Sequence, residues 1–287
     1  MSASLDAEAA APLEDGARCA LADAPPRDLS GRGPLLFVAG FLIAFVGSMC
    51  GIGGGLFTVP VLHFGFKLHL RRSVATSLCL VFATTVAATA TEMLSGESSI
   101  VWRLVGCLVV GTLLGTQLGY PVSKRFNSRN LRGIFALVIL FSAYRILFGG
   151  AADAESVQGA IRWTAALYAG VAGFFAGFLS PILGIGGGLV TVPALLLGPS
   201  ALTYQGVRAC SMATAVATSG RSLSLYWKER EVHPQAVWPL VGGAILGAIS
   251  GVNTVHNPEV VQFARTLLGF ILVVVSLRFA WAWYRGR

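Results

Sequence analysis

One glycine-rich motif occurs twice in the chain. Residues 51–62 read GIGGGLFTVPVL and residues 184–195 read GIGGGLVTVPAL, so the two stretches differ at only two positions. Chance does not explain such a match at a separation of 133 residues. The chain is therefore an internal duplication, and its two halves are expected to adopt related folds.

Shorter matches extend the duplication beyond the motifs. Ala75-Thr76-Ser77 aligns with Ala209-Cys210-Ser211, and glycines at four-residue spacing correspond as well: Gly111, Gly115 and Gly119 with Gly243, Gly247 and Gly251. We place the two repeats at 34–150 and 161–287, joined by a linker at 151–160. Residues 1–33 are rich in Ala, Pro and Asp, lack periodicity and are expected to form a disordered cytoplasmic tail.

Composition places both repeats in a membrane. Apolar residues make up 55% of the chain, charged residues only 12%, and the mean hydropathy is +0.72. A soluble chain of this length still exposes about a quarter of its unfolded surface, so it could not hide this much apolar area. We therefore exclude a soluble enzyme, a disulfide scaffold, a disordered chain and a nucleic-acid module, and expect an all-α polytopic membrane protein. The net charge of +8 does not point to nucleic acid, because the cations lie mostly between apolar runs.

Two of the apolar segments are too long for one crossing. A span needs about 20 residues, whereas segments 34–66 and 161–198 have 33 and 38 residues and contain the glycine motifs. Glycine and proline interrupt helices, and a broken backbone survives in a bilayer only inside protein or beside water. Each long segment is therefore either a re-entrant hairpin of two half-helices or one bent crossing. The half-helices would be 35–49 with 55–66 and 163–182 with 188–198. The six further apolar segments are 73–95, 101–121, 131–148, 207–227, 236–253 and 260–284.

Charge counting favours the re-entrant hairpins. Two single crossings divide Lys and Arg 12 to 9 between the two sides, whereas two hairpins divide them 16 to 5. The positive-inside rule prefers the stronger bias. Each repeat then has a hairpin plus three transmembrane helices, so the repeats are inverted and both termini are cytoplasmic, as in many secondary transporters of the cytoplasmic (inner) membrane.

The chemistry expected at the hairpin tips is anion binding by main-chain amides. The first N–H groups of a helix lack intrahelical partners, and the helix dipole adds positive charge there. Gly53, Gly54 and Gly55, with Gly186, Gly187 and Gly188, would supply these donors, and nearby Ser and Thr could add hydroxyls. The alternative is that the glycines only permit close helix packing. We expect packing to explain the glycines at four-residue spacing.

Few charged side chains lie in the apolar segments. Arg208 and Arg221 are either interfacial cations or anion ligands, and His63 is either a packing residue or a titrating group. Glu92 is the only carboxylate within a predicted span, near its end, and this scarcity argues against a cation pump or channel. The five cysteines show no metal-ligand spacing. They are expected to be buried hydrophobes, unless Cys50 or Cys210 handles solute. No catalytic or nucleotide-binding motif is present, so we expect neither an enzyme nor a cofactor or metal.

The twin motifs and the small residues that follow them resemble the sulfite exporter TauE/SafE family of membrane transporters. The resemblance covers nearly all of 34–284 and implies transport of sulfur-containing anions such as sulfite or sulfonates. This chain departs from the usual Ala-Thr-Ser at Cys210. The candidate substrate-binding residues are Gly51, Gly53, Gly54, Gly55, Thr58, Thr76, Ser77, Gly184, Gly186, Gly187, Gly188, Thr191, Arg208, Cys210 and Ser211.

The leading hypothesis is thus a secondary anion transporter that works by alternating access. An anion channel, a transporter of another small organic anion, and an intramembrane enzyme or scaffold are the alternatives. The expected partners are a small anion and the lipid bilayer, with a homo-oligomer compatible with this plan and nucleic acid excluded.

Overall fold

The structure is a computed structural model. It describes residues 30–66, 68, 70–95, 99–125, 140, 163–197, 202–228, 234–254, 273–274, 276–277 and 280–281. Every regular element in these ranges is helical, which confirms the predicted all-α fold. The linker 151–160, nearly all of the tail 1–33 and most of segments 131–148 and 260–284 lie outside the described residues.

The described helices follow the same order in both repeats. The first repeat contains α2 (Gly33–Met49), α3 (Gly55–Pro60), the π-helix η2 (Val61–Gly65), α4 (Leu70–Leu94) and α5 (Trp102–Arg125), preceded by a short 3₁₀ turn, η1 (Ser30–Arg32). The second contains α7 (Trp163–Leu183), α8 (Gly188–Leu197), α9 (Tyr204–Lys228) and α10 (Pro234–Thr254). Helices α4 and α9 both have 25 residues and are offset by 134 positions, so their residues correspond one to one.

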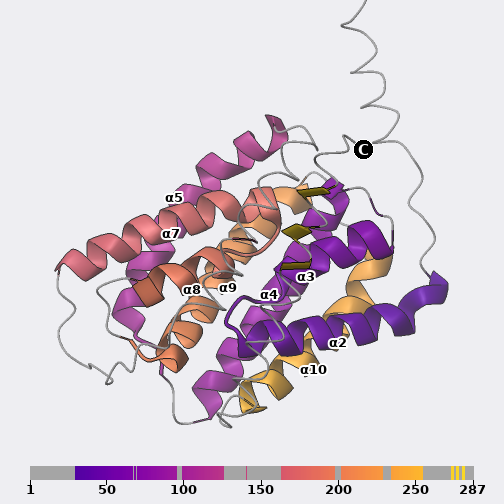
Figure 1. The fold of residues 1–287 in the computed structure, drawn as a ribbon, viewed down its shortest axis with the longest axis horizontal. Helices are drawn as coiled ribbons and strands as arrows, with labels where there is room; N and C mark the ends of the chain where they lie inside the picture. Colours follow the sequence, from indigo (N-terminus) through magenta and orange to yellow (C-terminus); the bar gives the residue numbers. More distant parts are fainter. Residues whose placement is uncertain are drawn as a thin grey trace, which may run out of the picture.

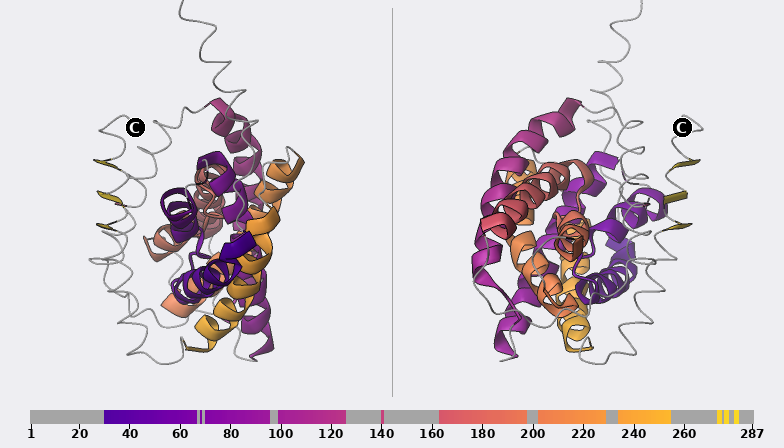
Figure 2. Two further views of the ribbon diagram at one scale, coloured as in Figure 1. Left: turned by 90° about the vertical axis from the view of Figure 1, so that its right-hand side faces the viewer. Right: turned by 60° about the vertical axis from the view of Figure 1, so that its left-hand side comes forward.

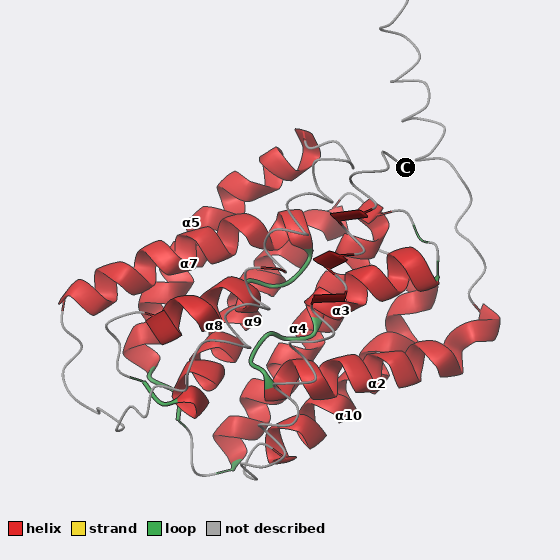
Figure 3. Cartoon of the chain, viewed as in Figure 1, coloured by secondary structure: helices red, strands yellow, loops and turns green. Residues whose placement is uncertain are grey.

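Both long apolar segments break at the glycine motif. Gly51, Gly53 and Gly54 have φ angles of 74°, 77° and 80°, and the matching Gly184, Gly186 and Gly187 have 70°, 73° and 86°. Residues with a Cβ rarely adopt this left-handed conformation, so glycine is required at the same three places in each repeat. The green loop between α2 and α3 lies near the middle of the helical assembly (Figure 3).

The second limb of each broken segment folds back along the first. In the second repeat, Tyr168 near the start of α7 donates to the carbonyl of Ala194 near the end of α8, over 3.0 Å. In the first repeat, Leu36 near the start of α2 shares an apolar cluster with Leu62 of η2. Pro60 ends α3, and η2 continues with π-helical turns, because proline offers no N–H for the regular helical ladder.

The two repeats exchange helices at the outer edges of the molecule. Helix α5 of the first repeat packs along α7 of the second, and α10 of the second packs along α2 of the first (Figures 1 and 2). A Cβ on Gly111, Gly115 or Gly119 would overlap carbonyl oxygens of α7, and one on Gly243 or Gly247 would overlap carbonyl oxygens of α2. These glycines therefore serve close helix packing, as expected from their spacing.

Helices α4 and α9 cross in opposite directions at the centre. Glu92, near the end of α4, contacts Arg208, near the start of α9. Further along, a Cβ on Gly220 of α9 would lie 3.1 Å from the ring of Phe82 on α4. The start of α4 and the end of α9 therefore lie at one end of the molecule, and the end of α4 and the start of α9 lie at the other.

Within the described residues, four helices are long and apolar enough to span a membrane: Leu70–Leu94, Trp102–Ser123, Trp163–Leu183 and Val237–Thr254. Large apolar side chains remain exposed on the outer helices, including Leu114 of α5, Leu167 of α7 and Leu246 of α10. Exposed apolar side chains on the outer helices suit contact with lipid.

Candidate functional site

The two glycine tips contact each other inside the molecule. A Cβ on Gly55, the first residue of α3, would lie 2.7 Å from the carbonyl oxygen of Gly184 in the other tip. A Cβ on Gly188, the first residue of α8, would lie 2.9 Å from the carbonyl oxygen of Gly51. All residues from 51 to 55 and from 184 to 188 are buried. The fold thus brings together two motifs that are 133 positions apart in the chain.

A reciprocal pair of serine hydrogen bonds joins each tip to the other repeat. Ser77 of α4 donates to the carbonyl of Gly184 over 2.8 Å and also lies 3.3 Å from the carbonyl of Gly55. Ser211 of α9, its counterpart, donates to the carbonyl of Gly51 over 2.8 Å. Both serines are fully buried. Their hydroxyl protons are therefore engaged in tying the repeats together, although their oxygen atoms can still accept.

The threonines after the motifs stabilise their own tips. Thr58 donates to the carbonyl of Gly54 over 3.0 Å, and Thr191 donates to the carbonyl of Gly187 over 3.1 Å. Both side chains are buried, and the same two carbonyls also accept backbone N–H groups, so each hydroxyl adds a further bond to its tip. The structure gives these two hydroxyls the same role in both repeats.

The tip amides differ in how they are used. The N–H of Gly53, which we expected to be a free donor, donates to the carbonyl of Gly47 over 3.2 Å. The carbonyl of Gly47 also accepts the N–H of Ile52 over 2.9 Å. Among the described residues, the N–H groups of Gly54, Gly55, Gly186, Gly187 and Gly188 have no acceptor. These five amides remain the main-chain donors of the candidate site.

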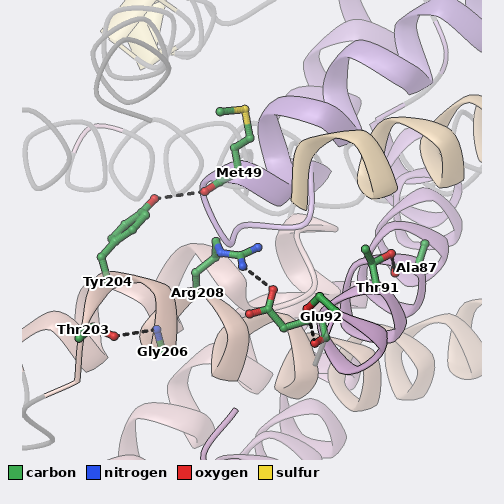
Figure 4. Close-up of polar contacts among 9 residues, drawn as sticks. Met49, Ala87, Thr91, Glu92, Thr203, Tyr204, Gly206 and Arg208 are labelled. Carbon is green, nitrogen blue, oxygen red and sulfur yellow. Dashed lines mark hydrogen bonds and ion pairs between the residues drawn. The ribbon is translucent and has the colours of Figure 1, made fainter. Parts of the chain in front are cut away.

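Arg208 brings a buried positive charge to the first tip. Its stem packs on Gly51, since a Cβ there would lie 3.1 Å from Cγ of Arg208. Its Nη2 donates to Oε2 of Glu92 over 2.5 Å, and the two side chains are only 3% and 9% exposed (Figure 4). Arg208 is therefore an interior residue that is paired across the repeats, and it does not extend to the surface as an interfacial cation.

Two buried polar atoms on α4 and α9 have no hydrogen-bond partner. One is Nε of Arg208, and the other is the hydroxyl oxygen of Thr89, one turn before Glu92 on α4. Most buried polar atoms in proteins are paired, so unpaired ones indicate either strain or a place for a ligand. A guanidinium has five donors in a fixed plane, which suits an oxyanion.

The ion pair exists at only one end of the crossing helices. The positions of the first and second repeat that correspond to Arg208 and Glu92 are Val74 and Tyr226, and both belong to one apolar cluster. Tyr226 donates its hydroxyl to the carbonyl of Pro181 over 2.7 Å. One end of the two crossing helices thus carries an ion pair, whereas uncharged side chains occupy the equivalent positions at the other end.

The remaining predicted residues have other surroundings. Thr76 and Cys210 are corresponding residues and are both fully buried, and the sulfur of Cys210 accepts the N–H of Val101 over 3.3 Å. His63 on η2 is half-buried, with Nδ1 3.0 Å from the carbonyl of Leu68. Arg221 is half-buried on α9. No group of three His, Cys, Asp or Glu side chains suited to a metal ion occurs in the described part of the chain.

Sequence reasoning left out Glu92 and Thr89 as site residues. Ionisable groups within a membrane usually pair with one another, and Glu92 was the only carboxylate in a predicted span that could pair with Arg208. That signal was available in the sequence. The unpaired hydroxyl of Thr89 had no such signal, because many Thr residues occur in these helices.

Comparison with known proteins identifies the family. A family model described as sulfite exporter TauE/SafE matches residues 14–146 and 169–287. The chain belongs to the sulfite exporter TauE/SafE family. It is therefore a member of a membrane transporter family, and the resemblance noted from the glycine motifs is confirmed.

Curated relatives of this TauE/SafE chain are named as probable membrane transporter proteins. The "Probable membrane transporter protein YunE" of Bacillus subtilis is 26% identical over 110 residues, which is 38% of this chain and 40% of YunE. A probable membrane transporter protein of Methanocaldococcus jannaschii is 27% identical over 170 residues, 57% of this chain and 61% of the relative. One of Xylella fastidiosa is 23% identical over 253 residues, 85% of this chain and 93% of the relative. The chain thus spans about half the length of the first two. No solved structure matches it significantly.

Proposed function

We propose that the protein is a secondary transporter that moves small sulfur-containing anions, such as sulfite or sulfonates, across the cytoplasmic membrane. Membership of the family supports the class of solute. The observation that carries the proposal is the buried guanidinium of Arg208 against the Gly51 tip, with its Nε unpaired. A cation held at such cost inside a membrane protein favours an anion as its ligand.

Inverted repeats are part of this proposal. Helices α4 and α9 are equivalent and cross in opposite directions, as expected if a two-fold axis in the membrane plane relates the repeats. The fold-back of α8 along α7 supports re-entrant hairpins over single bent crossings. Each hairpin enters and leaves the membrane on the same side, the first on the cytoplasmic side and the second on the opposite side. The start of α4 and the end of α9 then face the cytoplasm.

The packing of the tips supports the proposal of alternating access. Every candidate glycine is buried, and each tip contacts the other, so this conformation is closed to solute. Solute can then reach the main-chain donors of the tips only if one repeat moves relative to the other. The unlike closures at Arg208–Glu92 and at Val74–Tyr226 are the proposed barriers to the two sides.

Flux into liposomes tests the proposal. Purified protein is reconstituted and assayed with sulfite, thiosulfate, a sulfonate and sulfate, and we expect saturable uptake of at least one of the first three. Gly187→Leu should abolish this uptake, because φ is 86° at this position and the tip is buried. Gly106→Leu is the matched control, because a Cβ at Gly106 meets no atom within 4 Å.

Two outcomes contradict the proposal. Full uptake by a folded Gly187→Leu protein would exclude a role for this tip. Uptake that rises linearly with solute concentration, at rates far above those of carriers, would indicate that the protein is an anion channel and not a transporter.

A further inference from the structure

The guanidinium of Arg208 always needs a negative partner. A charge that is removed from water and left unpaired is strongly destabilising, as is the deletion of one partner of a buried pair. Glu92 supplies the negative charge in the closed conformation, through one bond from Nη2. Nε stays unpaired, so the carboxylate satisfies the cation only in part. An oxyanion with three or more oxygens could engage more of these donors.

The two partners belong to different repeats. Glu92 lies on α4 and Arg208 on α9, so any motion of one repeat against the other stretches or breaks the pair. Glu92 also lies only three residues from Ser95, an exposed polar residue just past the end of α4. A displaced carboxylate therefore has a short path to water, whereas Arg208 is held against Gly51.

We propose that Glu92 is an internal competitor for Arg208, which a transported anion replaces when it binds and which reoccupies the guanidinium when the anion leaves. This inference rests on the proposed anion site. It adds that binding of solute opens the end of the molecule at Glu92, because the ion pair that joins α4 to α9 is exchanged for an ion pair with the solute. Thr89, whose hydroxyl is unpaired, lies one turn before Glu92 on α4 and is a further candidate donor.

The other end of the molecule cannot work in this way. Val74 and Tyr226 occupy the equivalent positions and carry no charge, so no solute anion competes with them. The exchange is therefore confined to the end that holds the ion pair.

Anion-dependent thermal unfolding of the purified protein tests the inference. The unfolding temperature is measured over a range of sulfite, sulfate and chloride concentrations at constant pH. Glu92→Gln removes the competitor and leaves Arg208 without a charge partner. We expect the concentration of the preferred anion that gives half of the stabilisation to fall about tenfold, within the usual range of coupling between two sites. The double variant Glu92→Gln/Arg208→Met should lose the response.

Two further variants keep the test decisive. Tyr226→Phe changes the equivalent position of the second repeat and should leave the anion response as in the wild type. Glu92→Asp keeps the charge and shortens the side chain by one methylene, so its half-maximal concentration should lie between those of the wild type and Glu92→Gln. This variant replaces Glu92→Gln if the latter does not fold.

The inference is overturned if neither Glu92 variant binds any of the three anions more tightly than the wild type, or if the double variant still responds. Liposome flux separates this failure from failure of the proposed function. Saturable flux without any effect of the Glu92 variants on anion affinity would reject Glu92 as a competitor and retain the proposed transport function. Tighter anion binding in Glu92→Gln without flux of any sulfur anion would support Glu92 as a competitor and reject the proposed substrate class.

Discussion

The hydroxyl of Ser211 donates to the carbonyl oxygen of Gly51 over 2.8 Å and so joins the second repeat to the tip of the first. Replacing Ser211 by Ala leaves that buried carbonyl without its donor, which typically costs about 1–3 kcal/mol. Ser77→Ala, the equivalent change, should have a similar effect through Gly184. The unfolding temperature in detergent measures both losses. Ser250→Ala is the control, because its exposed hydroxyl bonds within its own helix and should change little. If Ser211→Ala and Ser77→Ala unfold at the same temperature as the Ser250→Ala control, these contacts do not hold the repeats together.

Gly51→Ala should disturb the tip and Arg208 together. The left-handed conformation at φ 74° costs a residue with a Cβ about 1–2 kcal/mol, and the new methyl group would lie 3.1 Å from Cγ of Arg208. We therefore expect lower stability and weaker anion binding. Gly106→Ala, in open space on α5, tests for the general effect of the substitution and should leave both unchanged. If Gly51→Ala binds the anion as tightly as the wild type, the packing of Arg208 on Gly51 does not contribute to anion binding.

Gly115→Ala should act on stability alone. Its Cβ would overlap the carbonyl oxygen of Phe174, so α5 and α7 would have to separate. Overpacking of this kind typically costs about 1–3 kcal/mol. Thermal unfolding should detect the loss, and the anion affinity of the folded fraction should remain that of the wild type. Gly170→Ala on α7 is the control, since a Cβ at this glycine meets no atom within 4 Å.

Labelling of introduced cysteines tests the inverted topology. Gly65→Cys and Lys228→Cys are exposed positions near the start of α4 and at the end of α9, and both should react with a membrane-impermeant thiol reagent from the cytoplasmic side. Ser95→Cys and Gln205→Cys, exposed at the opposite ends of these helices, should react only from the other side. The background carries Ser at the native cysteines. Reaction of Gly65→Cys and Lys228→Cys from opposite sides would contradict inverted repeats.

The helix breaks were predictable because their causes are local. Glycine clusters and prolines interrupt helices wherever they occur, so the expected limbs 163–182 and 188–198 agree with α7 and α8 to within one residue at each end. The packing role of Gly115 was predictable for the same reason, since four-residue spacing places small residues on one helix face.

The charges and donors of the site needed three-dimensional knowledge. The sequence indicated Glu92 as a partner of Arg208 only by elimination, as the one carboxylate in a predicted span, whereas the contact itself depends on how α4 and α9 pack against each other. Likewise, the sequence indicated a hydroxyl at Ser211 but could not indicate that the carbonyl of Gly51 takes its proton. The N–H of Gly53 is a similar case, because its acceptor, the carbonyl of Gly47, is reached only once the chain turns.

The ion pair of Arg208 and Glu92 has no counterpart at Val74 and Tyr226. A carrier with two identical ends would load and unload solute with the same rate constants from either compartment. A charge pair at one end makes those rate constants unequal, while the final distribution of solute still depends only on the gradients. In the proposed carrier, duplication supplies the two exchanging halves, and one unmatched residue pair makes transport in the two directions kinetically unequal.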